Sequence, residues 1–480
     1  MPQKSRQIIK VLLFFSILVS ALIQPCVSHA ETIWERRKRA VQDITSSAQE
    51  PAQEQAAQTA AIGSIDPLEI LIPEQYGTII ETHTGTNGKL IVHIQDAHAN
   101  YEGQMNSAKI IESLIEGYDL NLILGEGHSN DEDYKHLRVR ASLEDRKEVA
   151  DGLVKEGYFT GINYLDLATD YWTKVRGIED RDLYEAHTAS LWEIDTFKDL
   201  ASEYIDKLIN VSDMIKPEIY NEDLLAFDSK KKDYDAEKID LLSYYEYLYK
   251  KAEENDAPLY VFPNFSNLIK ASKIEKSINM AAIRSGEASG KELELYNEYT
   301  ELTNELNINA LFKEEPMLED FITDMLASSL DQSNLLKISK ALSIMKNLLR
   351  IKVVPEEYKY FTENKRDFDP QFWTGFLKGK VQELGLSADM PTNYYIISDN
   401  LTKIEEFYSM AAEREKVFLE RTNKHMADEN ADLAVLVAGG FHTPTLMNLL
   451  ADAGYSYIVV SPKVTTETDD ELYRWALKLR

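Results

Sequence analysis

The sequence is poor in cysteine, and this scarcity excludes several kinds of chemistry. Only one cysteine, Cys26, occurs in 480 residues, and it lies in an amino-terminal segment that we expect to be removed. The remaining chain would then have no thiol, which excludes disulfides, cysteine nucleophiles, zinc–thiolate sites and iron–sulfur clusters. We therefore expect the fold to be stabilised by its core alone.

Basic residues are scarce relative to acidic ones. The chain has 52 Lys and Arg against 81 Asp and Glu, a formal net charge of −29 at pH 7. A surface this acidic repels phosphate backbones and anionic lipid headgroups. Basic runs occur at Arg36–Arg39 and Lys230–Lys232. The composition thus favours a small-molecule or peptide substrate as partner over nucleic acid or a membrane surface.

The apolar run near the amino terminus is too short to span a membrane. Val11–Ile23 falls short of the roughly 20 residues needed. It follows a basic start and precedes the small-residue pattern Ser28–Ala30, an arrangement typical of a cleavable secretory signal. We predict a signal peptide over residues 1–30, a mature chain without a membrane span, and a periplasmic or secreted location. A retained membrane anchor is the less favoured alternative.

Short apolar runs predict an α/β fold with a mostly parallel sheet flanked by helices. Asn121–Leu124 and Lys174–Ile178 are expected as inner strands. Leu433–Val437 and Tyr455–Val460 bracket a helical pattern. Strand, helix and strand in this order, with strands apolar on both faces, are typical of a parallel sheet covered by helices.

Two further apolar runs predict a β-hairpin. Thr78–Thr82 and Leu90–Ile94 flank the segment Gly85–Gly88, which contains an Asn-Gly pair. Asn-Gly between two runs of strand-forming residues is a strong hairpin signal. We therefore expect these two strands to be direct neighbours.

A long stretch between the two strand-rich parts has a different character. From about Leu183 to Met426 the pattern is helical, and this stretch is too long for a loop. It predicts a large all-helical insertion that interrupts the α/β domain. We predict a signal peptide (1–30), a low-complexity linker (31–66), the first half of the α/β domain (67–190), the helical insertion (191–420) and the second half (421–480).

Polar residues follow the predicted strand ends. His98 comes just after one strand, Glu126 after the next, and His442 after the late strand. Ligands of parallel sheets gather at the carboxyl ends of strands, so we expect these three side chains to share a site. The residues expected around them, or in contact with substrate, are Asp96, His128, Glu179, Asp180 and Arg181.

The remaining histidines have ordinary structural interpretations. His83 and His93 lie in strand bodies and are expected as sheet residues. His136, His187 and His425 lie in helical patterns and are expected at the surface or between domains.

Two imidazoles and a carboxylate suit two kinds of hydrolytic site. They can bind a borderline divalent metal with open positions for water. Without metal, they suit a histidine general base aligned by a carboxylate. The GxSxG, HExxH, Walker A and GxGxxG motifs are absent, so serine hydrolase, zincin and nucleotide-binding interpretations lack their usual support.

The late segment resembles a known superfamily. Val437–Pro444, followed by a helical pattern and a strand, resembles the carboxyl-terminal GxxH segment of the TraB/TIKI, ChaN and erythromycin-esterase-like superfamily. Arg421–Ala427 is similar to the Arg-Asn-x-x-Met-Ala helix of that group. The layout of His98 and Glu126 agrees as well, although Gln95–His98 lacks the leading glycine of the first GxxH motif. The resemblance covers roughly residues 88–182 and 415–465.

This resemblance implies three kinds of activity. TIKI-type members are metal-dependent peptidases, esterase-like members hydrolyse without metal, and ChaN-like members are linked to haem or iron uptake. Carried over to this chain, it implies His98, Glu126 and His442 as the catalytic core and the metal ligands, with Arg421 close by. Our hypothesis is an exported peptidase- or esterase-like hydrolase, with or without a divalent Mn, Co, Fe or Zn ion. The alternative is a non-catalytic haem- or metal-binding protein of ChaN type, so the sequence leaves open whether the protein is an enzyme.

Overall fold

The computed structural model describes residues 66–128, 133–469, 472 and 475. The predicted signal peptide, and the predicted linker apart from Asp66, lie outside this part of the chain. Among the described residues, no helix combines the length and the apolar character needed to cross a membrane.

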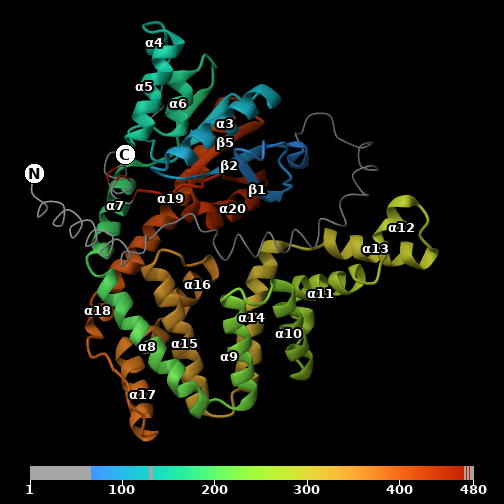
Figure 1. The fold of residues 1–480 in the computed structure, drawn as a ribbon, viewed down its shortest axis with the longest axis vertical. Coiled ribbons are helices and arrows are strands. Elements are labelled where there is room, and N and C mark those ends of the chain that lie inside the picture. The colour runs from blue at the N-terminus through green and yellow to red at the C-terminus, as the bar shows by residue number, and fades with distance from the viewer. Residues whose placement is uncertain (1–65, 129–132, 470–471, 473–474, 476–480) are drawn as a thin grey trace, which may run out of the picture.

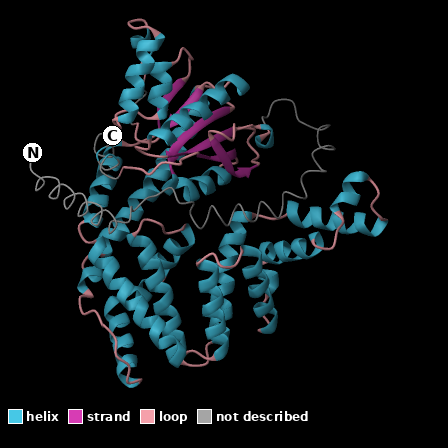
Figure 2. Ribbon diagram, viewed as in Figure 1, coloured by secondary structure: helices cyan, strands magenta, loops and turns pink. Residues whose placement is uncertain are grey.

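Six strands form one sheet in the order β1-β6-β2-β5-β3-β4 (Figures 1 and 2). Only the pairing of β1 with β6 is antiparallel within this described sheet, and the other neighbours run parallel. This confirms the predicted α/β class with a mostly parallel sheet. The strands are β1 (Gly77–His83), β2 (Leu90–Asp96), β3 (Leu122–Gly125), β4 (Lys174–Gly177), β5 (Leu433–Gly439) and β6 (Ser456–Pro462).

Helices cover both faces of this sheet, which is why its central strands are apolar on both sides. Alternate residues of β2 point to opposite faces: Val92 and Ile94 pack with α3 and α6, whereas Ile91 packs with α19 and α20. All seven residues of β2 and of β5 are buried. The elements around the sheet are η1 (Pro67–Glu69), α3 (Tyr101–Tyr118), α4 (Lys135–Arg138), α5 (Leu143–Lys155), α6 (Gly161–Ala168), α7 (Arg181–Asp195), α19 (Leu401–Asp428), η4 (Gly440–His442) and α20 (Thr443–Asp452).

The predicted hairpin is wrong, because β6 lies between β1 and β2. The connecting segment instead crosses the start of β6, where the amides of Thr86 and Asn87 donate to the carbonyl oxygen of Gly454. A Cβ atom at Gly85 would lie 2.3 Å from that same oxygen, so the crossing requires glycine there. Gly85, one of the glycines of the predicted turn, therefore serves a close approach of two backbones.

The prediction that Lys174–Ile178 forms an inner strand is also wrong. Strand β4 pairs only with β3 and lies at the edge of the sheet. Its residues alternate in exposure, with Lys174 exposed and Val175 buried, so one face of this edge strand is covered and the other is open.

Between β4 and β5 the described chain is entirely helical, which confirms the predicted helical insertion in the α/β sequence. This region lies to one side of the sheet in Figure 1, and α7 and α19 connect the two. It has its own apolar cores, one around α8, α15 and α17 and another around α10, α11 and α14. Its elements are α8 (Lys198–Ile219), α9 (Glu222–Asp235), α10 (Leu241–Glu254), η2 (Leu259–Val261), α11 (Pro263–Glu275), α12 (Met280–Ser285), α13 (Gly290–Asn304), α14 (Ile308–Leu326), α15 (Leu330–Leu349), α16 (Pro355–Glu363), η3 (Lys365–Phe368), α17 (Pro370–Glu383) and α18 (Tyr395–Ser398).

Helix α19 belongs to both parts of the molecule. It has 28 residues, which corresponds to a length of about 42 Å. Phe407, near its start, packs in the helical core, whereas Phe418 and Met426 pack in the core beneath the sheet. Helices α7 and α19 therefore run across the predicted boundaries at residues 190 and 420.

His93 is a buried sheet residue whose protonation state is fixed by its neighbours. Its Nδ1 lies 3.2 Å from the carbonyl oxygen of Leu436, and its Nε2 lies 2.9 Å from the hydroxyl of Thr443. Because a carbonyl only accepts, Nδ1 carries the proton and Nε2 accepts from Thr443. Burial lowers the pKa of His93 to about 4, so the imidazole is neutral in the folded protein.

This depressed pKa predicts a loss of stability in acid. Between pH 6.5 and pH 4 the unfolded chain binds the proton that folded His93 resists, so the free energy of unfolding falls as the pH is lowered through this range. The contribution of this one group is on the order of 3 kcal/mol. Urea unfolding at pH 7 and pH 4 should show that the free energy of unfolding falls less for His93→Gln than for the wild type. The control His136→Gln removes an exposed histidine and should behave as the wild type. An equal fall in the free energy of unfolding in all three proteins would contradict the lowered pKa of His93.

Candidate functional site

The carboxyl ends of four parallel strands meet at one edge of the sheet and deliver the predicted polar residues there. Asp96 ends β2, Glu126 follows β3, Glu179 follows β4 and His442 follows β5 by way of η4. Because β2, β5, β3 and β4 are consecutive neighbours, these positions line one continuous edge. The structure thus brings residues separated by more than 300 positions in the sequence to one place.

His98 is held by a carboxylate and remains partly accessible. Its Nδ1 lies 2.5 Å from Oδ2 of Asp96. The amide nitrogen of Gln104 donates to Oδ1 of the same carboxylate, while the amide oxygen of Gln104 accepts from the backbone of Gly161. The side chain of Asp96 is 4% exposed and that of His98 is 14% exposed. The Asp96 carboxylate is therefore fixed by α3 and α6, and it orients an imidazole that solvent can reach.

His98 and Glu126 border the same small space above Gly439. A Cβ atom at Gly439 would lie 3.3 Å from Nε2 of His98 and 3.4 Å from Oε2 of Glu126. The amide of Gly439 also donates to Oε2 of Glu126 at 2.6 Å. Glycine at this position therefore lets an imidazole and a carboxylate approach the end of β5 together.

Behind this space, Arg414 of α19 uses all five of its N–H donors on the surrounding residues. Its Nε donates to Glu179 at 3.1 Å, and its Nη2 donates to Glu179 at 2.6 Å and to Glu126 at 2.8 Å. Its Nη1 lies 2.8 Å from Nδ1 of His187 and 3.3 Å from Nε2 of His442. One buried guanidinium thus connects the ends of β3 and β4 with α7 and η4.

The electrostatics of this cluster keep Glu126 ionised. Burial by itself would raise the pKa of Glu126, but His442, Arg414 and His98 together hold its pKa well below the usual value. Burial likewise opposes the charge of Arg414, and the carboxylates of Glu126 and Glu179 reverse this effect and raise its pKa. The site therefore contains a fixed negative charge at Glu126 beside the imidazole of His98.

His442 is oriented by contacts at both of its ring nitrogens. Its Nδ1 lies 3.0 Å from Oε1 of Glu415, and its Nε2 lies 3.5 Å from Oε1 of Glu126. Its side chain is 4% exposed, less than that of His98. His442 is therefore buried within the cluster, whereas His98 lies at its open side.

Three residues of this cluster were missing from the sequence prediction of the site. Arg414 and Glu415 lie inside α19, and His187 lies inside α7. Of the two placements expected for His187, the surface is wrong, because the residue is 6% exposed. It stacks on Phe407 of the helical core with ring centroids 4.3 Å apart, in keeping with the other expectation, a place between the two parts of the molecule. Burial and contact with Arg414 lower the pKa of His187 to about 2, so it is neutral and accepts from the guanidinium.

Some predicted site residues lie at the margin of the cluster or outside it. Arg421 donates to the backbone oxygen of Glu179 and lies 3.6 Å from Asp180, which caps α7. Arg181 is 72% exposed and pairs with Glu185, so it does not belong to the site. The resemblance implied Arg421 close to the catalytic core, but the arginine that contacts Glu126 is Arg414, two helical turns earlier on the same face of α19.

His128 supports the turn after β3. Its Nδ1 lies 2.9 Å from the carbonyl oxygen of Glu126, which only accepts, so Nδ1 carries the proton. The residue is 8% exposed. Its contact fixes the backbone that carries Glu126.

Glu126 and His442, which the resemblance implies as metal ligands, already have protein partners in this structure. Oε1 of Glu126 already accepts from the guanidinium of Arg414, and a divalent ion at this oxygen would lie beside a like charge. Nδ1 of His442 faces Glu415. Among the described residues, no group of three or more His, Cys, Asp or Glu side chains is arranged to hold a metal.

Comparison of the chain with protein-family models, with curated proteins and with solved structures gives no match. The resemblance to the TraB/TIKI, ChaN and erythromycin-esterase-like superfamily therefore stays a prediction from the motifs.

The contacts of Arg414 predict a large difference between two arginines of the same helix. Arg414→Met removes the charge that compensates two buried carboxylates, and we expect it to lower the free energy of unfolding by about 3–5 kcal/mol. Arg421→Met removes a side chain that is 31% exposed and should cost less than about 1 kcal/mol. Urea unfolding of both variants tests this, and similar losses would show that Arg414 does not organise the site.

Proposed function

We propose that the cluster at the carboxyl edge of the sheet is the catalytic centre of a metal-free hydrolase that cleaves carboxylic esters. The observation that carries this proposal is the pair formed by Asp96 and His98, whose Nε2 borders the same space as the ionised Glu126. An imidazole that a carboxylate orients at one nitrogen is suited to general base catalysis through the other nitrogen. The greater exposure of His98 among the clustered histidines supports its contact with substrate.

In the proposed reaction, neutral His98 removes a proton from water. The Nδ1 proton stays on the imidazole and is donated as a hydrogen bond to the Asp96 carboxylate, so the lone pair of Nε2 accepts the proton of the attacking water. The water oxygen forms a bond to the acyl carbon, and the bond between that carbon and the alkoxy oxygen breaks. The imidazolium then donates its proton to the departing alkoxide, which leaves as an alcohol beside the carboxylic acid product.

Glu126 acts in this scheme through its charge. Its pKa is held low by Arg414, His442 and His98, so it stays ionised beside the imidazole. A negative charge here favours the imidazolium that forms during water attack. All N–H donors of Arg414 contact protein groups, so we assign it the role of a positioning residue.

A small apolar cavity adjoins the buried side of the cluster. Its volume is about 60 Å³, and it is lined by Glu415 and Phe441 together with residues of α16, α19 and α20. This volume corresponds to roughly two water molecules. Neither His98 nor Glu126 lines this cavity, so it adjoins the cluster on the side of Glu415 and not at the proposed general base.

The proposal predicts a specific role for His98. His98→Ala should lower kcat/KM for p-nitrophenyl acetate by about 10²–10⁴-fold, because it removes the general base. The melting temperature should stay close to that of the wild type, since His98 is at the open side of the cluster. His425→Ala, on α19 but outside the cluster, is the matched control and should keep its activity. Full activity of His98→Ala would overturn the proposal.

Metal independence is a separate prediction. Dialysis against a chelator should leave ester hydrolysis within about twofold of the untreated rate, because no step uses a metal Lewis acid. Elemental analysis of the purified protein should show substoichiometric Mn, Co, Fe and Zn. Loss of activity on chelation, restored by one of these ions, would instead support the TIKI-like alternative.

A further inference from the structure

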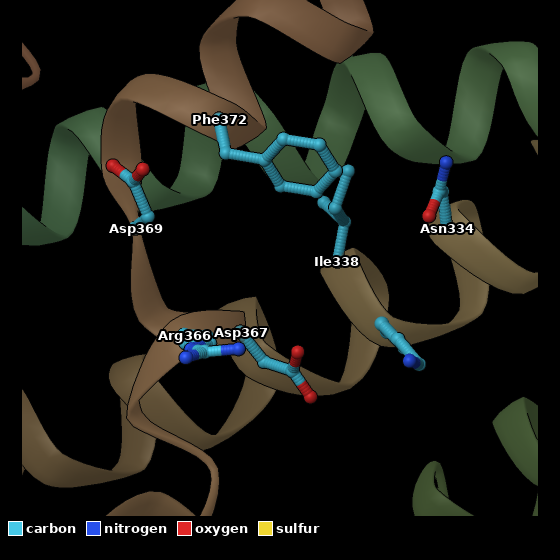
Figure 3. Close-up of a pocket in the computed structure, with 7 residues that line it drawn as sticks. Asn334, Ile338, Arg366, Asp367, Asp369 and Phe372 are labelled. Atoms are coloured by element: carbon cyan, nitrogen blue, oxygen red, sulfur yellow. The ribbon is translucent and has the colours of Figure 1, made fainter.

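A second cavity lies in the helical region, away from the sheet edge. Its volume is about 300 Å³, at the lower end of the range of roughly 300–1,000 Å³ for small-molecule sites. Figure 3 shows Phe372 and Ile338 on one side of it and Arg366 and Asp367 on the opposite side. The cavity is formed by α15, η3 and the start of α17 and is lined by Asn334, Lys337, Ile338, Arg366, Asp367, Asp369 and Phe372.

The two cations at this cavity have no acidic partner, unlike the lysines around them. Lys340, Lys365 and Lys380 each have a carboxylate oxygen within 2.6 Å. By contrast, no ion pair or hydrogen bond joins the exposed side chain of Lys337 or of Arg366 to another residue in the described part of the chain. Two exposed cations that line one concave surface are suited to bind an anionic group of a ligand.

Two carboxylates at the same cavity exclude a strongly anionic ligand. Asp367 accepts from the hydroxyl of Tyr360 through Oδ2, and Asp369 caps α17 by accepting from Gln371 through Oδ1. Both carboxylates line the same cavity as Lys337 and Arg366, so the cavity presents acidic and basic side chains together. A phosphate dianion would be repelled by these charges, whereas a ligand with one carboxylate and one ammonium group matches them.

The aromatic side chain at the cavity indicates a third property of the ligand. Phe372 is 42% exposed, although it lies beside the apolar side chain of Ile338. A bound apolar group would cover its ring and gain hydrophobic free energy.

From these observations we propose that the cavity between α15, η3 and α17 binds a zwitterionic α-amino acid with an apolar side chain. Arg366 and Lys337 bind its carboxylate, Asp369 binds its ammonium group, and Phe372 packs on its side chain. This site is independent of the proposed hydrolytic centre.

Three probes test the proposal on the full chain by isothermal titration calorimetry. L-Phenylalanine carries both charges, N-acetyl-L-phenylalanine has only the carboxylate, and L-phenylalaninamide has only the ammonium group. We expect saturable binding of L-phenylalanine and at least about tenfold weaker binding of each derivative. Failure of L-phenylalanine to bind, or equal binding of a derivative, would overturn the proposal.

Two variants test whether L-phenylalanine binds at this cavity. Arg366→Gln should weaken binding of L-phenylalanine by about tenfold or more, which is about 1.4 kcal/mol. Lys378→Gln removes an exposed cation of α17 outside the cavity and should leave binding unchanged. Both variants should hydrolyse p-nitrophenyl acetate as the wild type does, so this test is separate from that of the proposed function. Equal binding by Arg366→Gln and the wild type would place the ligand elsewhere.

Discussion

The structure around the sheet edge depends on one buried guanidinium. Arg414 is 4% exposed, and removing such a charge from water is costly unless every donor finds a partner. Here all five N–H groups find partners on four residues, and the rings of Tyr184 and Phe418 lie 5.0 and 5.4 Å from its central carbon. These contacts exist only when α19 lies against the ends of β3 and β4. The contacts of Arg414 therefore fix both the position of α19 and the geometry of the site.

This arrangement divides the polar residues into two groups with different tasks. Glu126, Glu179, His187 and His442 are buried around Arg414 and hold one another in place. His98 lies in front of them, oriented by Asp96 and open to solvent. Because α19 also packs in the core of the helical region, the site lies at the junction of the two parts of the molecule. The helical region thus contributes to the site through Arg414 and Glu415, and it carries a separate charged cavity between α15, η3 and α17.

The sequence predicted the features that depend on local pattern. Apolar β-branched runs identify buried strands, and polar residues directly after parallel strands meet at one edge, so His98, Glu126 and His442 could be grouped in advance. The prediction of a hairpin failed because the Asn-Gly signal is local. It carries no information about β6, which is more than 360 residues away and lies between β1 and β2. Arg414 was missed because it shares a helix face with Arg421, and only packing decides which of the two reaches Glu126.

The central claim is that Arg414 and Glu126 hold each other at the sheet edge. A double-mutant cycle with Glu126→Gln and Arg414→Met, measured by urea unfolding, tests this most directly. The account predicts a coupling free energy of about 2 kcal/mol or more, as for residues in one buried network. If the losses in the free energy of unfolding of the two single variants add up to that of the double variant within about 0.5 kcal/mol, the account is contradicted, because independent residues show additive effects.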